Sequence, residues 1–301
     1  MTTRPKFRKV DAKGILDSRP LPDTGFTALW DSIYVPDLTK DRLLAQGILN
    51  FTLRSKVSAA KIPLHGVILL VGPPGNGKTS LARGLASRIA KSMGSDGHFG
   101  YLEVEPHSIT SSSLGKSQQG VLELLGGTIS EQAHGHPLIV LLDEVETLAA
   151  NRSRMSMEAN PVDVHRATDA VLAQIDHLAA KHPNLLFLAT SNFAAAIDEA
   201  FLSRADLIIK VEPPTAQGRE QIIRDTLEEL ARAFPAVEKL ITPAHLKSLA
   251  TLSDGVDGRR LRKAVVNACA LDKQTAIDIE KLTFHDLQTA MRDVAEAKHA
   301  K

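Results

Sequence analysis

A glycine-rich loop that ends in a lysine and a threonine carries the residue pattern most directly tied to chemistry. It reads Gly72-Pro73-Pro74-Gly75-Asn76-Gly77-Lys78-Thr79-Ser80 and lies between an apolar run, 67–71, and a stretch with helical apolar spacing. Glycines let successive backbone N–H groups turn inward around a triphosphate, where a Cβ atom would obstruct them. In such a loop Lys78 reaches the β- and γ-phosphate oxygens and Thr79 binds magnesium. The loop therefore predicts a site for ATP and Mg²⁺.

A pair of carboxylates completes the predicted site. Five consecutive apolar residues, 138–142, predict a buried strand, and Asp143 and Glu144 follow directly. Ligands of open α/β sheets bind at the carboxyl ends of the strands. We expect Asp143 to hold Mg²⁺, mostly through water, and Glu144 to polarise the water that attacks the γ-phosphate. Alone, the pair would read as a solvated strand end, but the glycine loop favours the catalytic interpretation.

Two further polar residues are candidates for contact with a γ-phosphate. Asn192 follows the strand predicted at 185–190, so its amide is expected near the γ-phosphate or the attacking water, although strand-end asparagine is also a common turn former. Arg204 follows a helix at the far side of the sheet, where it would reach a neighbouring subunit's γ-phosphate more readily than its own. The alternative for Arg204 is an ion pair with Asp206 in the same chain.

The order of the remaining elements predicts the fold class. Strands alternate with helices from residue 26 onward, which indicates an α/β fold built on a parallel sheet, and after Pro213-Pro214 the pattern is entirely helical. The residues before 26 are polar and basic, and we expect a mobile lead, either a solvated tail or an arm that touches a partner. The three predicted parts are the lead, 1–25, the α/β ATPase domain, 26–213, and a small helical lid, 214–301.

The predicted lid holds one more candidate contact to the nucleotide. Gly258 and Arg259 open a helix, and Arg259 is expected to fold back onto bound nucleotide, so that the position of the lid depends on it. A solvated basic helix face is the alternative for the neighbouring Arg260 and Arg262.

Composition excludes several other classes of protein. The 301 residues include 36 Lys and Arg against 35 Asp and Glu, so no bulk basic field favours a nucleic acid partner. No apolar run approaches the ~20 residues that span a bilayer, and no signal peptide begins the chain, so we expect a cytoplasmic protein without membrane contact. The single cysteine, Cys269, lies among apolar residues and is expected to be buried.

In this order, the motifs resemble those of AAA+ ATPases and, more closely, those of the pachytene-checkpoint family, which remodels HORMA-domain proteins. The resemblance extends from residue 26 to the last helices and implies a homohexameric ring with nucleotide between subunits. It further implies that Arg204 acts on the neighbouring subunit's nucleotide and that Ile33 and Tyr34, within 29–34, border the adenine. The motifs that carry it are FTALWDS at 26–32, GPPGNGKTS at 72–80, LDEVETL at 142–148, VLAQID at 171–176, TSN at 190–192, IDEAFLSRAD at 197–206, PP at 213–214 and GRRLRK at 258–263.

The same resemblance implies two pore loops that pull on the client protein. Residues 111–115 match the first loop and residues 151–163 the second. The family pattern has an aromatic grip residue in the first loop, whereas this chain offers a serine and a leucine. Either the leucine provides an apolar grip or the arginines of the second loop provide traction. The candidate substrate-contacting residues are Ser113, Leu114, Arg152 and Arg154.

The short segment before residue 26 resembles bacterial members of the family, because eukaryotic members carry a sizeable N-terminal domain. Bacterial members are associated with cyclic-oligonucleotide anti-phage signalling, in which the ATPase separates a HORMA protein from a nucleotidyltransferase. A nucleic-acid-associated AAA+ loader or initiator, using ATP as a switch, is the alternative from the residues alone, and it predicts steeply salt-dependent DNA binding. A third reading, an ATP-gated scaffold, is disfavoured by Glu144.

Overall fold

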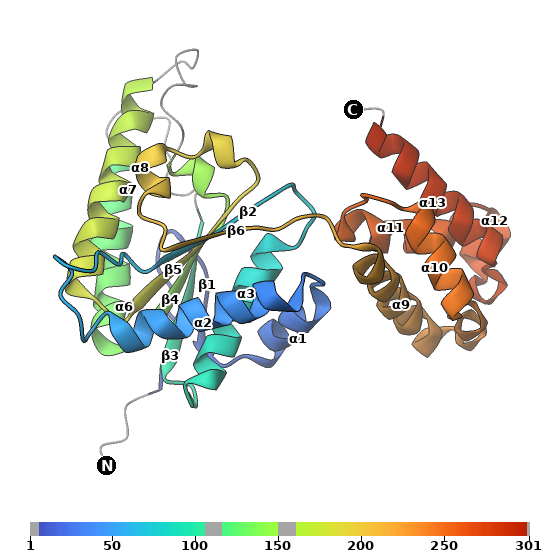
Figure 1. The fold of residues 1–301 in the computed structure, drawn as a ribbon, viewed down its shortest axis with the longest axis horizontal. Coiled ribbons are helices and arrows are strands. Elements are labelled where there is room, and N and C mark those ends of the chain that lie inside the picture. The colour runs from blue at the N-terminus through green and yellow to red at the C-terminus, as the bar shows by residue number, and fades with distance from the viewer. Residues whose placement is uncertain (1–5, 106–115, 150–160, 300–301) are drawn as a thin grey trace. The chain divides into compact units, whose positions relative to one another are not determined.

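The computed structural model describes residues 6–105, 116–149 and 161–299, and these form two compact units (Figure 1). The larger unit holds most of the chain before Val211. The smaller unit holds the described residues from Val211 onward together with two short segments, Ser32–Pro36 and Pro73–Gly77. The main division therefore falls just before the predicted boundary at Pro213-Pro214, and part of the glycine loop is grouped with the helical unit.

The elements follow the predicted alternation. The larger unit contains β1 (Ile15–Leu21), α1 (Thr24–Ser32), α2 (Asp37–Leu53), β2 (Val67–Val71), α3 (Lys78–Ser92), β3 (Phe99–Val104), α5 (Lys116–Val121), a π-helix (Leu122–Ile129), α6 (Ser130–Gly135), β4 (Leu138–Leu142), α7 (Pro161–Lys181), β5 (Leu185–Ser191), α8 (Glu199–Leu202) and β6 (Leu207–Lys210). The smaller unit contains α9 (Ala216–Ala233), α10 (Pro243–Leu252), α11 (Gly258–Ala268), α12 (Lys273–Ile277) and α13 (Phe284–His299).

A six-stranded sheet organises the described part of the larger unit, in the order β1-β3-β4-β5-β2-β6. The pairs β3 with β4, β4 with β5, β5 with β2 and β2 with β6 are parallel, which confirms the predicted α/β architecture. Only β1 joins in the antiparallel sense, so the sheet is mixed rather than purely parallel. Parallel strands end at one edge of a sheet, which places the segments after β2, β4 and β5 near one another.

The central strands are buried on both faces, which explains their continuous apolar sequences. Every residue of β2, β4 and β5 is buried. Helices α2 and α3 cover one face, and α6 and α7 cover the other (Figure 1). Alternate side chains of β5 therefore enter two different cores: Phe187 packs in the cluster that contains α7, whereas Leu186 faces the close approach of α2 and α3.

The predicted mobile lead is incorrect for its described residues, because this stretch supplies β1. Residues Ile15 to Leu21 pair with β3, and Leu21 is fully buried. Phe7, which precedes the strand, is also buried, and its ring occupies the space that a side chain at Gly100 would fill. Two apolar anchors therefore hold a segment whose other side chains are mostly polar or charged, and such a polar edge strand is difficult to recognise from sequence.

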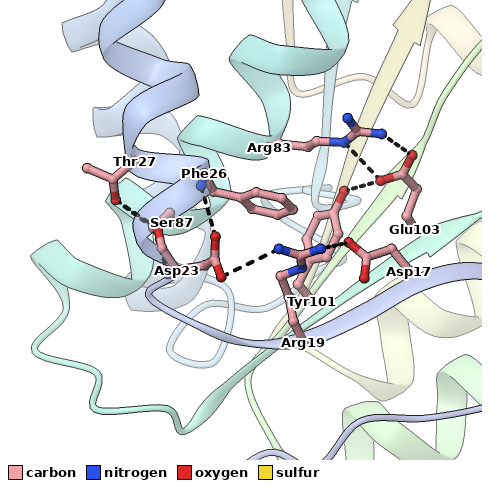
Figure 2. A network of polar contacts seen from close by, with 9 residues as sticks. All are labelled: Asp17, Arg19, Asp23, Phe26, Thr27, Arg83, Ser87, Tyr101 and Glu103. Carbon is pink, nitrogen blue, oxygen red and sulfur yellow. Dashed lines mark hydrogen bonds and ion pairs between the residues drawn. The ribbon is translucent and has the colours of Figure 1, made fainter.

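A polar network ties β1 to β3 and α3 (Figure 2). Glu103 is almost fully buried and accepts hydrogen bonds from Arg83 Nε (3.0 Å), Arg83 Nη2 (2.6 Å) and Tyr101 Oη (2.8 Å). Burial raises the pKa of Tyr101 and the neighbouring Glu103 carboxylate raises it further, so the phenol remains a donor. On the β1 side, Arg19 pairs with Asp17 and stacks over Phe26, 4.4 Å from the ring centroid. Arg19, one of the basic residues of the predicted lead, therefore contributes to packing within the chain.

The smaller unit has a core of its own, formed by the apolar faces of its helices. Its helix starts are capped as their sequences suggest: Thr283 Oγ1 accepts from Asp286 N–H (3.2 Å), and Asp286 Oδ2 accepts from Thr283 N–H (2.9 Å). Cys269 is buried in this core, as predicted. Across both units, the described helices include none long and apolar enough to cross a membrane.

Candidate functional site

The ends of β2, β4 and β5 meet at one edge of the sheet and bring the predicted phosphate-binding and acidic residues together. Val71 pairs with Ser191, and Leu142 pairs with Ala189. The glycine loop follows the first of these strands, Asp143 the second and Asn192 the third. We call the resulting group the strand-end cluster, and its members are Lys78, Thr79, Asp143, Glu144, Thr190 and Asn192.

Lys78 and Thr79, the first residues of α3, face this edge. Lys78 is buried and donates from Nζ to the carbonyl of Gly72 (2.8 Å) and to Asn192 Oδ1 (2.9 Å). Thr79 Oγ1 donates to Asp143 Oδ1 (2.8 Å). The next residue, Ser80, continues the helix. A buried ammonium beside a helix N-terminus creates a positive environment that suits a phosphate group.

Asn192 connects the lysine to the predicted catalytic carboxylate. Its Oδ1 accepts from Lys78, and its Nδ2 donates to Glu144 Oε1 (3.1 Å). Glu144 adopts φ 51° and ψ 52°, a left-handed conformation that costs a non-glycine residue about 1–3 kcal/mol. Surrounding contacts must maintain that conformation, and it directs the Glu144 side chain towards Asn192.

Thr190, to which the sequence analysis assigned no role of its own, holds both acidic residues. Its hydroxyl donates to Asp143 Oδ1 and accepts from the backbone N–H of Glu144 (3.1 Å). Side chains alternate along a strand, so residues 190 and 192 project from the same side of β5. That spacing, read with a predicted catalytic Asn192, was the available signal for Thr190.

The oxygens of Thr79 and Asp143 fit a magnesium ion in chemistry. A hydroxyl and a carboxylate already in contact are hard donors, and Mg²⁺ commonly takes one or two such protein ligands and completes its shell with water and substrate phosphates. The described residues contain no group of three or more His, Cys, Asp or Glu that could hold a metal ion. Thr79 and Asp143 are therefore the residues that would hold Mg²⁺.

The glycine loop has the backbone conformation that its composition suggests. Gly75 and Gly77 adopt φ values of 90° and 80°, which β-carbon-bearing residues rarely adopt. Asn76, between them, is buried and donates from Nδ2 to the carbonyl of Val211 (3.0 Å), and Pro73 and Pro74 precede them. Glycine therefore permits the conformation of the loop, and Asn76 anchors it to the Val211 carbonyl.

Within the smaller unit, the segment Ser32–Pro36 carries the two residues predicted to border the adenine, Ile33 and Tyr34. A Cβ atom on Gly77 would lie 2.5 Å from Ile33 Cδ1, so Ile33 packs directly against this glycine. Tyr34 donates from its hydroxyl to Asp225 (2.7 Å), and burial, followed by this contact, raises the pKa of Tyr34 to about 12. The apolar side chain of Ile33 next to a phosphate-binding loop suits the edge of an adenine site.

The start of α11 lies against the same loop segment. The backbone N–H of Arg259 donates to the carbonyl of Gly75 (3.2 Å), and the carboxylate of Asp257 accepts from Arg260 N–H (3.0 Å) as the helix cap. Gly258 is buried at the first helical position, whereas Arg259 is exposed. The start of α11 with Gly258 and Arg259 therefore lies against the glycine loop, and contact of the Arg259 side chain with nucleotide stays a prediction.

Arg204 lies at the opposite end of β2 from the glycine loop. Asp206, two residues later, accepts hydrogen bonds from the backbone N–H groups of Gly66 (2.6 Å) and Val67 (3.2 Å) at the start of the strand. The five residues of β2 span about 13 Å between its ends. Arg204 therefore lies near the Val67 end of β2, whereas the glycine loop follows the Val71 end, and action on a neighbouring subunit's nucleotide stays a prediction.

The predicted alternative partner of Arg204 is wrong, because its ion pair is with Asp176 rather than Asp206. Arg204 Nε donates to Asp176 Oδ1 (2.7 Å), Nη2 donates to Asp176 Oδ2 (2.7 Å), and Nη1 donates to the carbonyl of Ala200 (2.6 Å). The Asp176 hydrogen bonds raise the pKa of Arg204. The carboxylate of Asp206 instead accepts hydrogen bonds from the backbone at the start of β2. Its closeness to Arg204 in the sequence does not reveal this role.

The candidate pore-loop residues fall outside the described part of the chain. This applies to Ser113, Leu114, Arg152 and Arg154.

Comparisons with known proteins agree with this arrangement. The family described as "ATPase family associated with various cellular activities (AAA)" matches residues 68–213. The chain is 52% identical to CD-NTase-associated protein 6 of Pseudomonas aeruginosa, over 99% of this chain and 98% of that protein. It is 32% identical to the pachytene checkpoint protein 2 homolog of Danio rerio, over 90% of this chain and 68% of that protein.

A solved structure supplies the matching fold. One chain of the solved structure of the E. coli MS115-1 HORMA:CdnC:Trip13 complex matches this chain with a TM-score of 0.75 and 18% identity, over 92% of this chain and 94% of that chain. At that identity the match concerns the fold, while the relatives at higher identity establish the family. The chain belongs to the AAA ATPases, in the family of CD-NTase-associated protein 6 and pachytene checkpoint protein 2.

Proposed function

We propose that this protein hydrolyses ATP at the strand-end cluster. The observation that carries the proposal is the hydrogen-bonded series from Lys78 through Asn192 to Glu144, beside the contact of Thr79 with Asp143. It places a buried cation, a polar amide and a carboxylate base around one edge of the sheet. Phosphoryl transfer to water needs this set, because catalysis there consists mainly of positioning and charge stabilisation.

Each side chain has a distinct role in the proposal. Lys78 binds the β- and γ-phosphate oxygens, and Asn192 orients the γ-phosphate or the attacking water. Glu144 accepts a hydrogen bond from that water and takes its proton. Thr79 and Asp143 would hold Mg²⁺, which when bound neutralises charge on the phosphate oxygens. Ile33, Tyr34 and Arg259 are the proposed contacts on the adenine side and at the lid.

The proposed assembly is a homohexameric ring in which Arg204 acts on the nucleotide of the next subunit. Its position at the far end of β2 supports this, since a residue that cannot serve its own site can serve a neighbour across a head-to-tail interface. The arginine would stabilise charge that develops on the transferred phosphoryl group. The number six rests on the resemblance to the pachytene-checkpoint family.

The proposed client is a HORMA-domain protein in complex with a nucleotidyltransferase. Two observations support it: the relative with 52% identity is named as associated with a CD-NTase, and the solved neighbour comes from a HORMA:CdnC:Trip13 complex. We propose that ATP hydrolysis partly unfolds the HORMA protein, converts it from a closed to an open form and releases the nucleotidyltransferase. The protein would thereby restrain nucleotide signalling in anti-phage defence.

A capture experiment tests the function. Glu144→Gln should bind ATP but hydrolyse it slowly, so it should retain its client while ATP is present. Tagged Glu144→Gln protein is incubated with lysate of its host in ATP, washed, and then transferred to buffer without nucleotide. A HORMA-domain protein that is retained and then released supports the proposal. Retention of nucleic acid, or of proteins without a HORMA domain, contradicts it.

A further inference from the structure

We propose that Glu146 is a positioning residue for ATP hydrolysis, which fixes the backbone of Asn192 and so places its side chain between Lys78 and Glu144. This inference rests on the proposed ATPase function of the same cluster. Glu146 carries no role in the arrangement described so far. It acts through Asn192 and touches neither phosphate nor water.

The contact that supports this role is direct. Glu146 Oε1 accepts a hydrogen bond from the backbone N–H of Asn192 (3.0 Å), across 46 residues of sequence. A bond between an N–H donor and a charged acceptor is among the stronger hydrogen bonds in proteins. It links the turn after β4 to the residue that immediately follows β5.

The turn that carries Glu146 is anchored by buried residues on both sides. The short helix Val145–Thr147 follows Glu144, and both Val145 and Leu148 are buried in the core beneath the sheet. Thr147 N–H donates to the carbonyl of Glu144 (2.9 Å). Buried neighbours on both sides restrict movement of the turn, so the Glu146 carboxylate is held by the core and in turn holds Asn192.

The Glu146 carboxylate is not explained by a contribution to the stability of the fold. Its second oxygen, Oε2, is buried and has no hydrogen-bond partner among the described residues. A buried carboxylate oxygen without a partner lowers stability, and such atoms are uncommon in native proteins. A glutamate in this place is better explained by what its other oxygen fixes.

What it fixes is the residue with the most connections in the cluster. Asn192 uses its backbone N–H on Glu146, its Oδ1 on Lys78 (2.9 Å) and its Nδ2 on Glu144 (3.1 Å). A side-chain amide is short and follows its backbone closely. A backbone shift of about 1 Å would therefore break both side-chain contacts, and displacements of that size in active sites reduce rates by about 100-fold.

The first test compares two substitutions at this position. Glu146→Ala removes the acceptor, whereas Glu146→Gln keeps an oxygen that can accept the same N–H. We expect Glu146→Ala to lower the turnover number by about 10- to 100-fold and leave the dissociation constant for a fluorescent ADP analogue unchanged. Glu146→Gln should stay within about threefold of the unsubstituted protein, because its neutral oxygen makes a weaker bond.

A readout without nucleotide checks the contact itself. Amide hydrogen exchange of the peptide that covers Asn192, in nucleotide-free protein, should accelerate in Glu146→Ala and remain slow in Glu146→Gln. Equal exchange in both variants would overturn the proposal. Equal turnover in both variants would overturn it as well.

A double substitution separates positioning from a general structural effect. Asn192→Ala keeps the backbone N–H that donates a hydrogen bond to Glu146. It removes the side chain that this hydrogen bond positions. If Glu146 acts through that side chain, then Glu146→Ala causes no further loss of single-turnover rate in the Asn192→Ala protein. A second loss as large as the first would show that Glu146 supports the fold only, and would overturn the proposal. Failure of the ATPase function would look different, since the unsubstituted protein would then not hydrolyse ATP at all.

Discussion

The polar side chains that lie near the two ends of strand β2 differ in the partners that a single chain gives them. At the Val71 end, every member of the strand-end cluster has partners from that cluster, and together they form the set that phosphoryl transfer requires. At the Val67 end, Arg204 is held by Asp176 and the Ala200 carbonyl, away from that cluster. In the proposed function, the first end is the reaction site and the second supplies a cation to the site of a neighbouring subunit.

If Arg204 acts on a neighbouring subunit, as proposed, this difference teaches how a single chain can encode a site that needs two copies. A buried charge at the Val71 end needs local partners, because an unpaired charge in a protein interior is costly. Arg204 is only partly buried, and its guanidinium is held by Asp176, whose side chain is 44% exposed. An arginine fixed in this way at a surface can be presented to a neighbouring subunit with little loss of conformational freedom.

The largest expected effect comes from breaking the Val67 end. Arg204→Ala should lower ATP turnover by about 1,000-fold or more, the range seen when an arginine that stabilises phosphoryl transfer is removed. Nucleotide affinity, measured by titration with a fluorescent ATP analogue, should stay nearly constant. Arg232→Ala, which removes an exposed arginine of an ion pair in α9, is the matched control. Loss of nucleotide binding in Arg204→Ala would place this residue in its own site and end the contrast.

A smaller effect is expected from a conservative change at the Val71 end. Thr190→Val keeps the shape of the side chain but removes the hydroxyl that holds Asp143 and the Glu144 N–H. Changes to groups that orient a metal ligand cost about 10- to 100-fold in metal affinity or activity. The Mg²⁺ concentration that gives half-maximal turnover should rise by that factor, with Thr52→Val, an exposed helix position, as control. An unchanged Mg²⁺ dependence would show that Asp143 needs no help from β5.

The smallest effect is expected from the partner of the arginine. Asp176→Ala removes both hydrogen bonds to the guanidinium and leaves the one to Ala200, so Arg204 becomes less well oriented. Turnover should fall by about 3- to 30-fold, less than in Arg204→Ala. Because a partly exposed ion pair contributes about 1 kcal/mol or less, the melting temperature should change by no more than about 2–4 °C. A rise in turnover would mean that Asp176 restrains Arg204 rather than presenting it.

The residues near the Val71 end could be predicted from the sequence better than the partner of Arg204 near the Val67 end, for a physical reason. Backbone geometry imposes strict residue types on a phosphate loop, and parallel strands must end at one edge, so Lys78, Asp143 and Asn192 could be brought together without a structure. The partner of Arg204 comes from α7 and lies 28 residues away in sequence, and no local rule selects Asp176 over Asp206. Long-range ion pairs depend on how helices pack, which periodicity does not specify.

The same distinction applies to the fold. Buried strands such as β2 and β4 were recognised by their apolar runs, whereas β1 was missed because an edge strand with charged residues and Pro20 lacks that signal. Its position depends on Phe7 filling the space above Gly100 on β3, a contact between segments remote in sequence. The π-helix at Leu122–Ile129 differs from an α-helix in its hydrogen bonding, which the apolar spacing of a sequence does not distinguish.

The central claim is that the two ends of β2 serve one reaction in different subunits, and a mixing experiment tests it most directly. Glu144→Gln and Arg204→Ala proteins are each nearly inactive alone, but a ring that contains both has interfaces with an intact Glu144 on one side and an intact Arg204 on the other. Equal mixing should restore turnover to about a quarter of the unsubstituted level, as random assembly of a cyclic ring implies. Turnover that stays at the level of the separate variants, although differently tagged subunits purify together, would contradict the account.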